Sequence, residues 1–68
     1  MDVRLTVTRC VDDEGPVWLF EGEDEAGRVH RFLVSESAGQ PILEALLRRD
    51  GEAIIVDITE HQLVGVAS

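Results

Sequence analysis

The chain has 68 residues, of which 44% are apolar, and its 14 acidic residues against six basic ones give a net charge of −8. This length allows one domain, residues 1–68, which buries only about 60% of the surface that its unfolded form exposes. The charge opposes binding to nucleic acid, which depends on neutralising phosphates, and favours basic partners. The apolar run Val17–Phe20 is far too short to cross a membrane.

Cysteine usage and the first residues predict a cytoplasmic protein with no membrane association. Cys10 is the only cysteine, so it can form neither an internal disulfide nor a zinc cluster. Met1–Arg4 carries an acid where a secretion signal needs a basic head followed by an apolar stretch. All six basic residues are arginine, which we interpret as the mark of a GC-rich or thermophilic bacterial genome.

Residues 2–11 predict the first strand, because apolar and polar residues alternate there with a period of two. The residues expected to share the core side are Val3, Leu5, Val7 and Val11. An acidic turn over residues 12–16 ends this strand at Gly15-Pro16.

Residues 17–21 and 28–34 predict a second and a third strand, and the turn composition of residues 22–27 predicts that they form a hairpin. If the turn centres on Glu25 and Ala26, Glu23 faces Arg28 and Glu21 faces His30. Opposite charges across a strand pair contribute roughly 0.2–1 kcal/mol each and support this register.

A helix follows, and Pro41 suits its first position because an N–H there would have no partner. Four apolar residues then recur at helical spacing, namely Ile42, Leu43, Leu46 and Leu47. Arg48 and Arg49 are expected in the last turn, where they suit the negative end of the helix dipole. Gly51 is expected to take the left-handed conformation beyond the helix end.

Residues 53–58 and 62–66 predict the last two strands, with Gly65 marking a weak point or a bulge. The order β-β-β-α-β-β, over nearly the whole chain, resembles the OB-fold, a small five-stranded Greek-key barrel. No sequence motif accompanies this resemblance. The alternatives are an SH3-like barrel and an open antiparallel sheet with one helix. Closure is favoured physically because it removes sheet edges.

The second hairpin, residues 17–34, holds every aromatic side chain of the protein beside several basic ones. In OB-like barrels the second and third strands commonly form the ligand face, so this hairpin is the first candidate binding site. The candidate residues are Trp18, Phe20, Arg28, His30 and Arg31. The competing interpretation is that the aromatic side chains form the core and the arginines pair with nearby acids.

Two turns concentrate negative charge. The acidic residues concerned are Asp12, Asp13, Glu14, Glu23, Asp24 and Glu25. Their spacing does not match a calcium-binding loop, so we predict no metal site. If the two turns formed one continuous surface, the protein could imitate nucleic acid and bind a basic groove on a partner.

No catalytic constellation is visible, and we predict neither an enzyme nor a cofactor. His30 and His61 have no further ligands at a recognisable spacing, and Cys10, although it follows Arg9, is expected to be an inert thiol.

The sequence therefore predicts a protein-interaction module or accessory subunit that uses the hairpin 17–34. The expected partner is another protein or a second copy of the chain. The alternatives are an OB-like binder of single-stranded nucleic acid, which the charge disfavours, and the acidic mimic.

Overall fold

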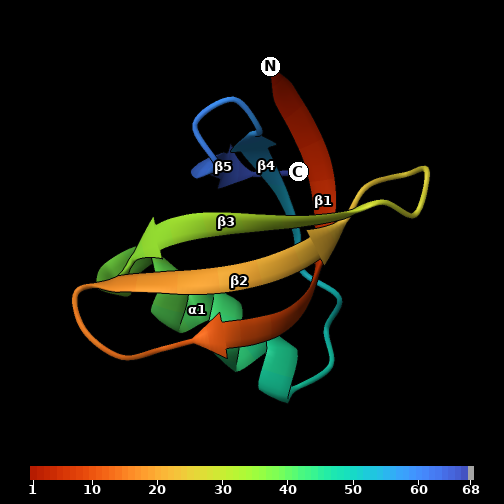
Figure 1. Ribbon diagram of the computed structural model, residues 1–68. Helices are drawn as coiled ribbons and strands as arrows, with labels where there is room; N and C mark the ends of the chain where they lie inside the picture. The colour runs from red at the N-terminus through yellow and green to blue at the C-terminus, as the bar shows by residue number, and fades with distance from the viewer. Residues whose placement is uncertain (68) are drawn as a thin grey trace.

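The computed structural model describes residues 1–67 and confirms the element order β-β-β-α-β-β, with five strands and one helix in that part of the chain (Figure 1). The elements are β1 (Asp2–Asp12), β2 (Val17–Glu23), β3 (Val29–Ser35), α1 (Glu36–Leu47), β4 (Ala53–Asp57) and β5 (Gln62–Val66). The helix in residues 1–67 is not long and apolar enough to cross a membrane.

The five strands form a closed ring in the order β1-β2-β3-β5-β4, in which β4 pairs back to β1. All of the pairings are antiparallel except that of β3 with β5, which is parallel. The alternative of an open antiparallel sheet is therefore wrong. The ring closes narrowly, since Leu33 with Gln62 is the single register pair that joins β3 to β5 within residues 1–67.

Strand β1 bends so that it can serve two neighbours. Its first half pairs with β4 and its second half with β2, and two irregularities interrupt the second pairing. Bulges of this kind bend a strand and increase its twist. They also change which residues face inward, because Cys10 packs against the core where the alternation predicted Val11. Gly22 lies beside the bend, where a Cβ atom would come within 3.0 Å of the Thr6 carbonyl oxygen.

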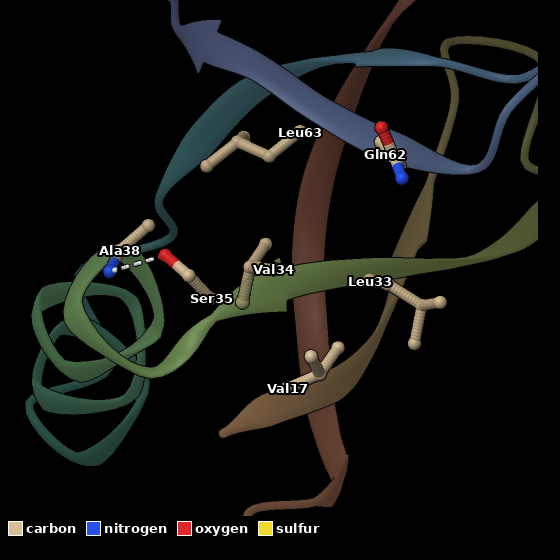
Figure 2. Close-up of a pocket in the computed structure, with 7 residues that line it drawn as sticks. All are labelled: Val17, Leu33, Val34, Ser35, Ala38, Gln62 and Leu63. Atoms are coloured by element: carbon tan, nitrogen blue, oxygen red, sulfur yellow. Dashed lines mark hydrogen bonds between the residues drawn. The ribbon is translucent and has the colours of Figure 1, made fainter.

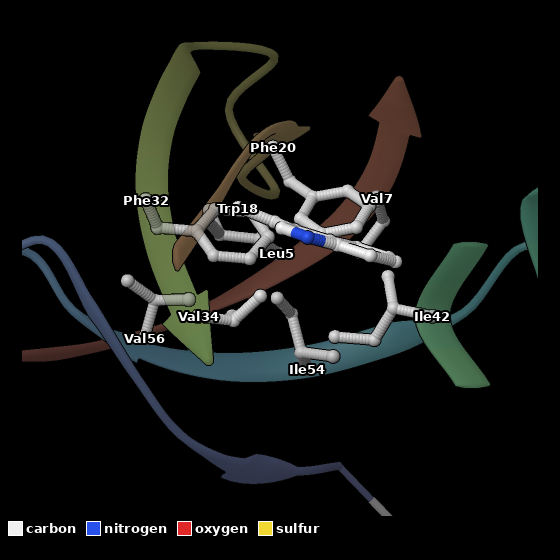
Figure 3. Packing of buried hydrophobic residues seen from close by; sticks show 9 residues of the cluster. All are labelled: Leu5, Val7, Trp18, Phe20, Phe32, Val34, Ile42, Ile54 and Val56. Carbon is white, nitrogen blue, oxygen red and sulfur yellow. The ribbon is translucent and has the colours of Figure 1, made fainter. Parts of the chain in front are cut away.

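The ring encloses the hydrophobic core, which is built by β1 to β4 and the helix (Figure 3), and Leu63 of β5 packs against it partly buried. Its fully or almost fully buried members are Leu5, Val7, Trp18, Phe20, Phe32, Val34, Ile42, Ile54 and Val56. Phe20 and Phe32 stack with their ring centroids 5.9 Å apart. Burying one such large side chain contributes about 1.5–3 kcal/mol, so this aromatic group is a main source of stability in a chain this short.

The register of the β2–β3 hairpin differs by one residue from the expected one. Glu23 lies opposite Val29 and Glu21 lies opposite Arg31. The cause is the connecting turn, in which the Asp24 carboxylate accepts hydrogen bonds from the N–H groups of Ala26 and Arg28, each at 2.9 Å. With these bonds the turn is centred on Ala26, so the loop is one residue longer than a turn centred on residues 25 and 26.

Helix α1 begins earlier than expected, at Glu36, and Pro41 lies inside it. Ser35 is the N-cap, and its side-chain oxygen accepts a hydrogen bond from the Ala38 N–H at 3.3 Å. A serine cap satisfies one of the free N–H groups of the first turn, which fixes the start more strongly than a proline can. Pro41 then supplies no N–H for the carbonyl four residues before it.

The helix ends at Leu47 with an unusual cap. The Asp50 N–H donates to the Ala45 carbonyl and the Arg49 N–H to the Leu46 carbonyl, which is the Schellman arrangement. Arg49 takes the left-handed position of this motif with φ of 60°, so the two arginines cap the helix and are not part of its last turn. Gly51 is left-handed too, as predicted. Leu47, the last of the four apolar residues at helical spacing, is 78% exposed.

Trp18 and Gly39 form one close contact between α1 and the ring, beside the packing of Ile42 on the core. The indole is 8% exposed and donates from Nε1 to the Gly15 carbonyl oxygen at 3.1 Å. A Cβ atom on Gly39 would lie 2.7 Å from the Cε3 atom of Trp18, closer than real side chains approach. The helix can therefore cover this end of the core only because residue 39 has no side chain.

We expect Gly39→Ala to destabilise the protein by about 1–3 kcal/mol through overpacking against the indole. In an ordinary helix the same change stabilises by about 1 kcal/mol, so the sign of the effect is diagnostic. Thermal and urea unfolding measure it. Gln40→Ala, on the exposed side of the same turn, is the matched control and should change little; a Gly39→Ala protein more stable than wild type would contradict the packing described.

Arg49→Gly should stabilise the protein by about 0.5–1 kcal/mol, because glycine avoids the cost of the left-handed conformation. Arg49→Gln removes the same charge and keeps the strained backbone, so it should bring no such gain. Urea unfolding of the three proteins separates the two effects. Equal stabilisation by both variants would assign the gain to charge and not to conformation.

Candidate functional site

Trp18 and Phe20, two of the five candidate binding residues, point into the core and not toward a partner. The expectation of an aromatic surface on β2 is corrected accordingly. Strand β2 has apolar residues on both faces, and the alternation does not say which set points inward. The larger side chains do, because they fill the ring and meet the helix, whereas Val17 points outward and is 50% exposed.

Arg28 and His30 gather around Asp24 at the β2–β3 turn. Arg28 Nε and His30 Nε2 each lie 2.9 Å from the Asp24 Oδ2 atom. The Asp24 Oδ1 atom accepts the two backbone N–H groups of the turn. The cluster thus has a structural task, which is to hold the turn, and its carboxylate is already fully engaged.

These contacts lower the pKa of Asp24 from 3.8 to about 2. The largest cause is the hydrogen bond from His30, followed by the hydrogen bond from the Arg28 backbone, and the charge of Arg28 contributes as well. Hydrogen bonds and a nearby positive charge both favour the ionised carboxylate. Because that carboxylate only accepts, His30 donates from Nε2.

Arg31, the last candidate residue, lies on the outer face of the sheet in a charged row. Its Nε atom is 3.0 Å from Glu21 Oε1, and Arg9 Nε on β1 is 3.1 Å from Glu21 Oε2. One carboxylate thus holds two arginines across three strands. Both guanidinium groups are largely exposed, and exposed pairs contribute about 0–1 kcal/mol each, so this row shapes the surface more than it stabilises the fold.

The other half of the outer face of β2 and β3 is apolar. Leu19 lies opposite Leu33, and Val17 lies diagonally across from Leu33. We call Val17, Leu19 and Leu33 the aliphatic patch. Val17 is 50% exposed and Leu33 is 42% exposed. On β2 and β3 no charged residue separates these three side chains, and Asp12 on β1 lies opposite Leu19 at their margin.

The aliphatic patch continues into a shallow groove of about 430 Å³ where β3 and β5 diverge (Figure 2). The groove is lined by Val17, Leu33, Val34, Ser35, Ala38, Gln62 and Leu63. Its end is formed by the first turn of α1, where the Ser35 side chain is occupied in capping the helix. Patch and groove together offer a mainly aliphatic contact surface with polar groups at its margin.

The two acidic turns lie at opposite ends of β2 and do not form one surface (Figure 1). Asp12, Asp13 and Glu14 belong to the β1–β2 connection, whereas Glu23, Asp24 and Glu25 belong to the β2–β3 connection. A seven-residue strand spans roughly 20 Å. The prediction of a continuous acidic surface is therefore wrong, and the mimic loses its geometric basis.

Cys10 is a partly buried free cysteine whose Sγ lies 3.9 Å from the Leu19 carbonyl oxygen. Burial raises the pKa of the Cys10 thiol, and the Asp13 carboxylate raises it further, so no effect of Arg9 prevails. Within residues 1–67, no group of three or more His, Cys, Asp or Glu side chains is arranged to hold a metal ion.

The structure corrects the sequence prediction at Trp18 and Phe20, which are buried, and leaves the outer face of the same hairpin as the candidate site. Val17, Leu19 and Leu33, which occupy odd-numbered positions of the two strands, lie on the outer face and were not among the predicted binding residues. The sequence of β3 indicates which face points inward. Arg31 and Leu33 alternate there with Phe32 and Val34, and arginine side chains are rarely buried, so Phe32 and Val34 are the inward residues. Residues opposite one another in an antiparallel pair share a face of the sheet. Trp18 lies opposite Val34 and Phe20 opposite Phe32, so both aromatic side chains of β2 point inward as well.

Comparisons of the chain with protein-family models, with curated proteins and with solved structures found no match. The site is therefore interpreted from its own geometry.

Asp24→Asn should destabilise the protein at neutral pH, because the amide keeps one acceptor for the turn but loses the ion pairs. A lowered pKa stabilises the fold above the unfolded value of 3.8, and this stabilisation disappears as the pH falls toward about 2. The difference in melting temperature between the wild type and the variant should therefore be constant above pH 4 and shrink between about pH 4 and 2.

Glu25→Gln in the same turn removes an exposed carboxylate that makes no ion pair within residues 1–67, so it serves as the control. A difference for Asp24→Asn that does not change with pH would contradict the lowered pKa of Asp24 in the folded protein.

Proposed function

We propose that the protein is a small OB-like barrel that works as a protein-interaction module. Several features support the OB-like assignment: the ring order β1-β2-β3-β5-β4, the parallel β3–β5 pair, the shared and bent β1, and the helix between β3 and β4. In such barrels the outer face of the second and third strands is the usual ligand surface. The aliphatic patch occupies that position here.

One observation carries the proposal of a protein partner: the outer face exposes aliphatic side chains, whereas all three aromatic side chains are buried. Apolar surface that remains exposed on a small domain commonly marks a contact site. Val17 and Leu33 are the exposed members, and the groove beside them can receive one aliphatic side chain of a partner.

The same observation argues against the alternative of a single-stranded nucleic-acid binder. Such proteins stack bases on aromatic rings and follow the phosphates with free basic groups. No aromatic ring faces outward here, and both arginines of the charged row, Arg9 and Arg31, are held by Glu21. A net charge of −8 adds general repulsion.

Replacing the exposed aliphatic residues should abolish partner binding and leave the fold intact. We expect the double variant Val17→Ser, Leu33→Ser to unfold within about 1 kcal/mol of the wild type, since exposed positions contribute little to stability. Proteins retained from a native extract by the immobilised wild type should be lost from this variant. Sedimentation over a wide concentration range shows in addition whether the partner is a second copy.

Val64→Ser is the matched control, because Val64 is similarly exposed on β5 but does not line the groove. It should retain the wild-type partners. An unchanged set of partners in the double variant would contradict the proposal. Binding of a labelled single-stranded oligonucleotide at low salt, measured by anisotropy, would favour the nucleic-acid alternative instead.

A further inference from the structure

Strand β3 has a free edge along its first half, which follows from one hydrogen bond and the strand register. The Leu33 N–H donates to the His61 carbonyl oxygen at 2.7 Å, so the backbone polar groups of Leu33 point away from β2 and toward β5. These groups alternate in direction along a strand. The β2–β3 pairing runs without interruption from Val29 to Ser35, so Val29 and Arg31 also direct their N–H and C=O groups away from β2.

Nothing within residues 1–67 pairs with β3 on that side at Val29–Arg31, because the β3–β5 contact consists of the Leu33–Gln62 pair alone. Val29 is 59% exposed and the Arg31 side chain is exposed as well. Unpaired N–H and C=O groups on an exposed strand are a template for another strand. The ring is therefore closed by one pair and remains open to strand addition beside it.

We propose that the β3 edge at Val29–Arg31 binds an extended, basic segment of a partner protein as an additional strand. This inference rests on the proposed interaction role and names the class of partner. In strand addition the main chain supplies affinity and alternate side chains supply specificity. The added strand would extend the outer face of β2 and β3, next to the charged row and the aliphatic patch.

The charges around the edge favour a basic segment. Arg28 pairs with Asp24, and Arg31 shares the single carboxylate of Glu21 with Arg9. Glu23, which lies opposite Val29, and Glu25, in the adjoining turn, make no ion pair within residues 1–67. Four acids (Glu21, Glu23, Asp24 and Glu25) against three arginines (Arg9, Arg28 and Arg31) leave the edge with a small negative balance, and the whole chain is negative too.

A second copy of the chain is a weaker occupant. Antiparallel pairing of two β3 edges joins only a three-residue segment from each copy, and it brings together two chains that each carry a charge of −8. Arg31 on the edge is the kind of charged residue that discourages such self-pairing.

The test is a titration of the folded protein with a short capped peptide in which arginine and valine alternate, followed by two-dimensional NMR. In the free protein the Val29 and Arg31 amides should exchange with solvent quickly, while the His30 and Phe32 amides, directed toward β2, are protected. Added peptide should slow exchange at Val29 and Arg31. The same peptide with glutamate in place of arginine should bind at least about tenfold more weakly.

Val29→Pro removes one exposed donor of the edge but no hydrogen bond to β2, and proline is tolerated at the first residue of a strand. It should weaken peptide binding by about tenfold or more, whereas Val29→Thr, which keeps the N–H, should stay within about twofold. If the proline variant does not fold, Glu25→Lys provides the second test, because it should weaken binding of the arginine peptide without touching the edge.

Three results would overturn the inference: protected Val29 and Arg31 amides in the free protein, no binding of the arginine peptide, or equal binding by wild type and Val29→Pro. Concentration-dependent protection of these amides without peptide would assign the edge to a second copy. The titration reports on the edge only. Partner loss in the Val17→Ser, Leu33→Ser variant tests the proposed function separately, so the two can fail independently.

Discussion

The inward direction of Trp18, and its contact with Gly39, is the constraint on which the rest of the structure depends. With the indole inside the ring, Phe20 follows inward two residues later, and the antiparallel register turns Phe32 and Val34 the same way. The helix can cover this packed end only where it has no side chain. The same phase leaves Val17, Leu19 and Leu33 outside, so the packing of the core also decides the composition of the candidate contact surface.

Closure of the ring is the second organising feature, and the pairing of β3 with β5 is short. Strand β1 pairs with both β2 and β4 by bending through two irregularities, which removes most of the edges that a five-stranded sheet would expose. The remaining join, between β3 and β5, consists of one register pair. The groove lies on one side of this join and the free edge of β3 on the other, so both proposed contact surfaces arise from the same narrow closure.

Charge has a local role that the net value of −8 conceals. In the β2–β3 turn, the Asp24 carboxylate accepts hydrogen bonds from the turn's own backbone. On the outer face, Glu21 pairs with Arg9 and Arg31. These residues order the hairpin and pair with its basic groups. Glu23 and Glu25, which make no ion pair within residues 1–67, flank the start of β3, and the proposal of a basic partner rests on them.

The sequence by itself determined the element order, most strand positions, the absence of a recognisable catalytic motif and the hairpin that holds the candidate site. Alternation and turn composition suffice for these, because both are local. Only the tertiary structure decided the phase of β2, the one-residue shift of the hairpin and the start of α1 at Glu36. Each depends on a contact between distant or competing groups: the indole against Gly39, the Asp24 carboxylate against two N–H groups, and the Ser35 cap against Pro41. Packing decides which face of an apolar strand stays exposed. The sequence of one strand does not show what packs against it.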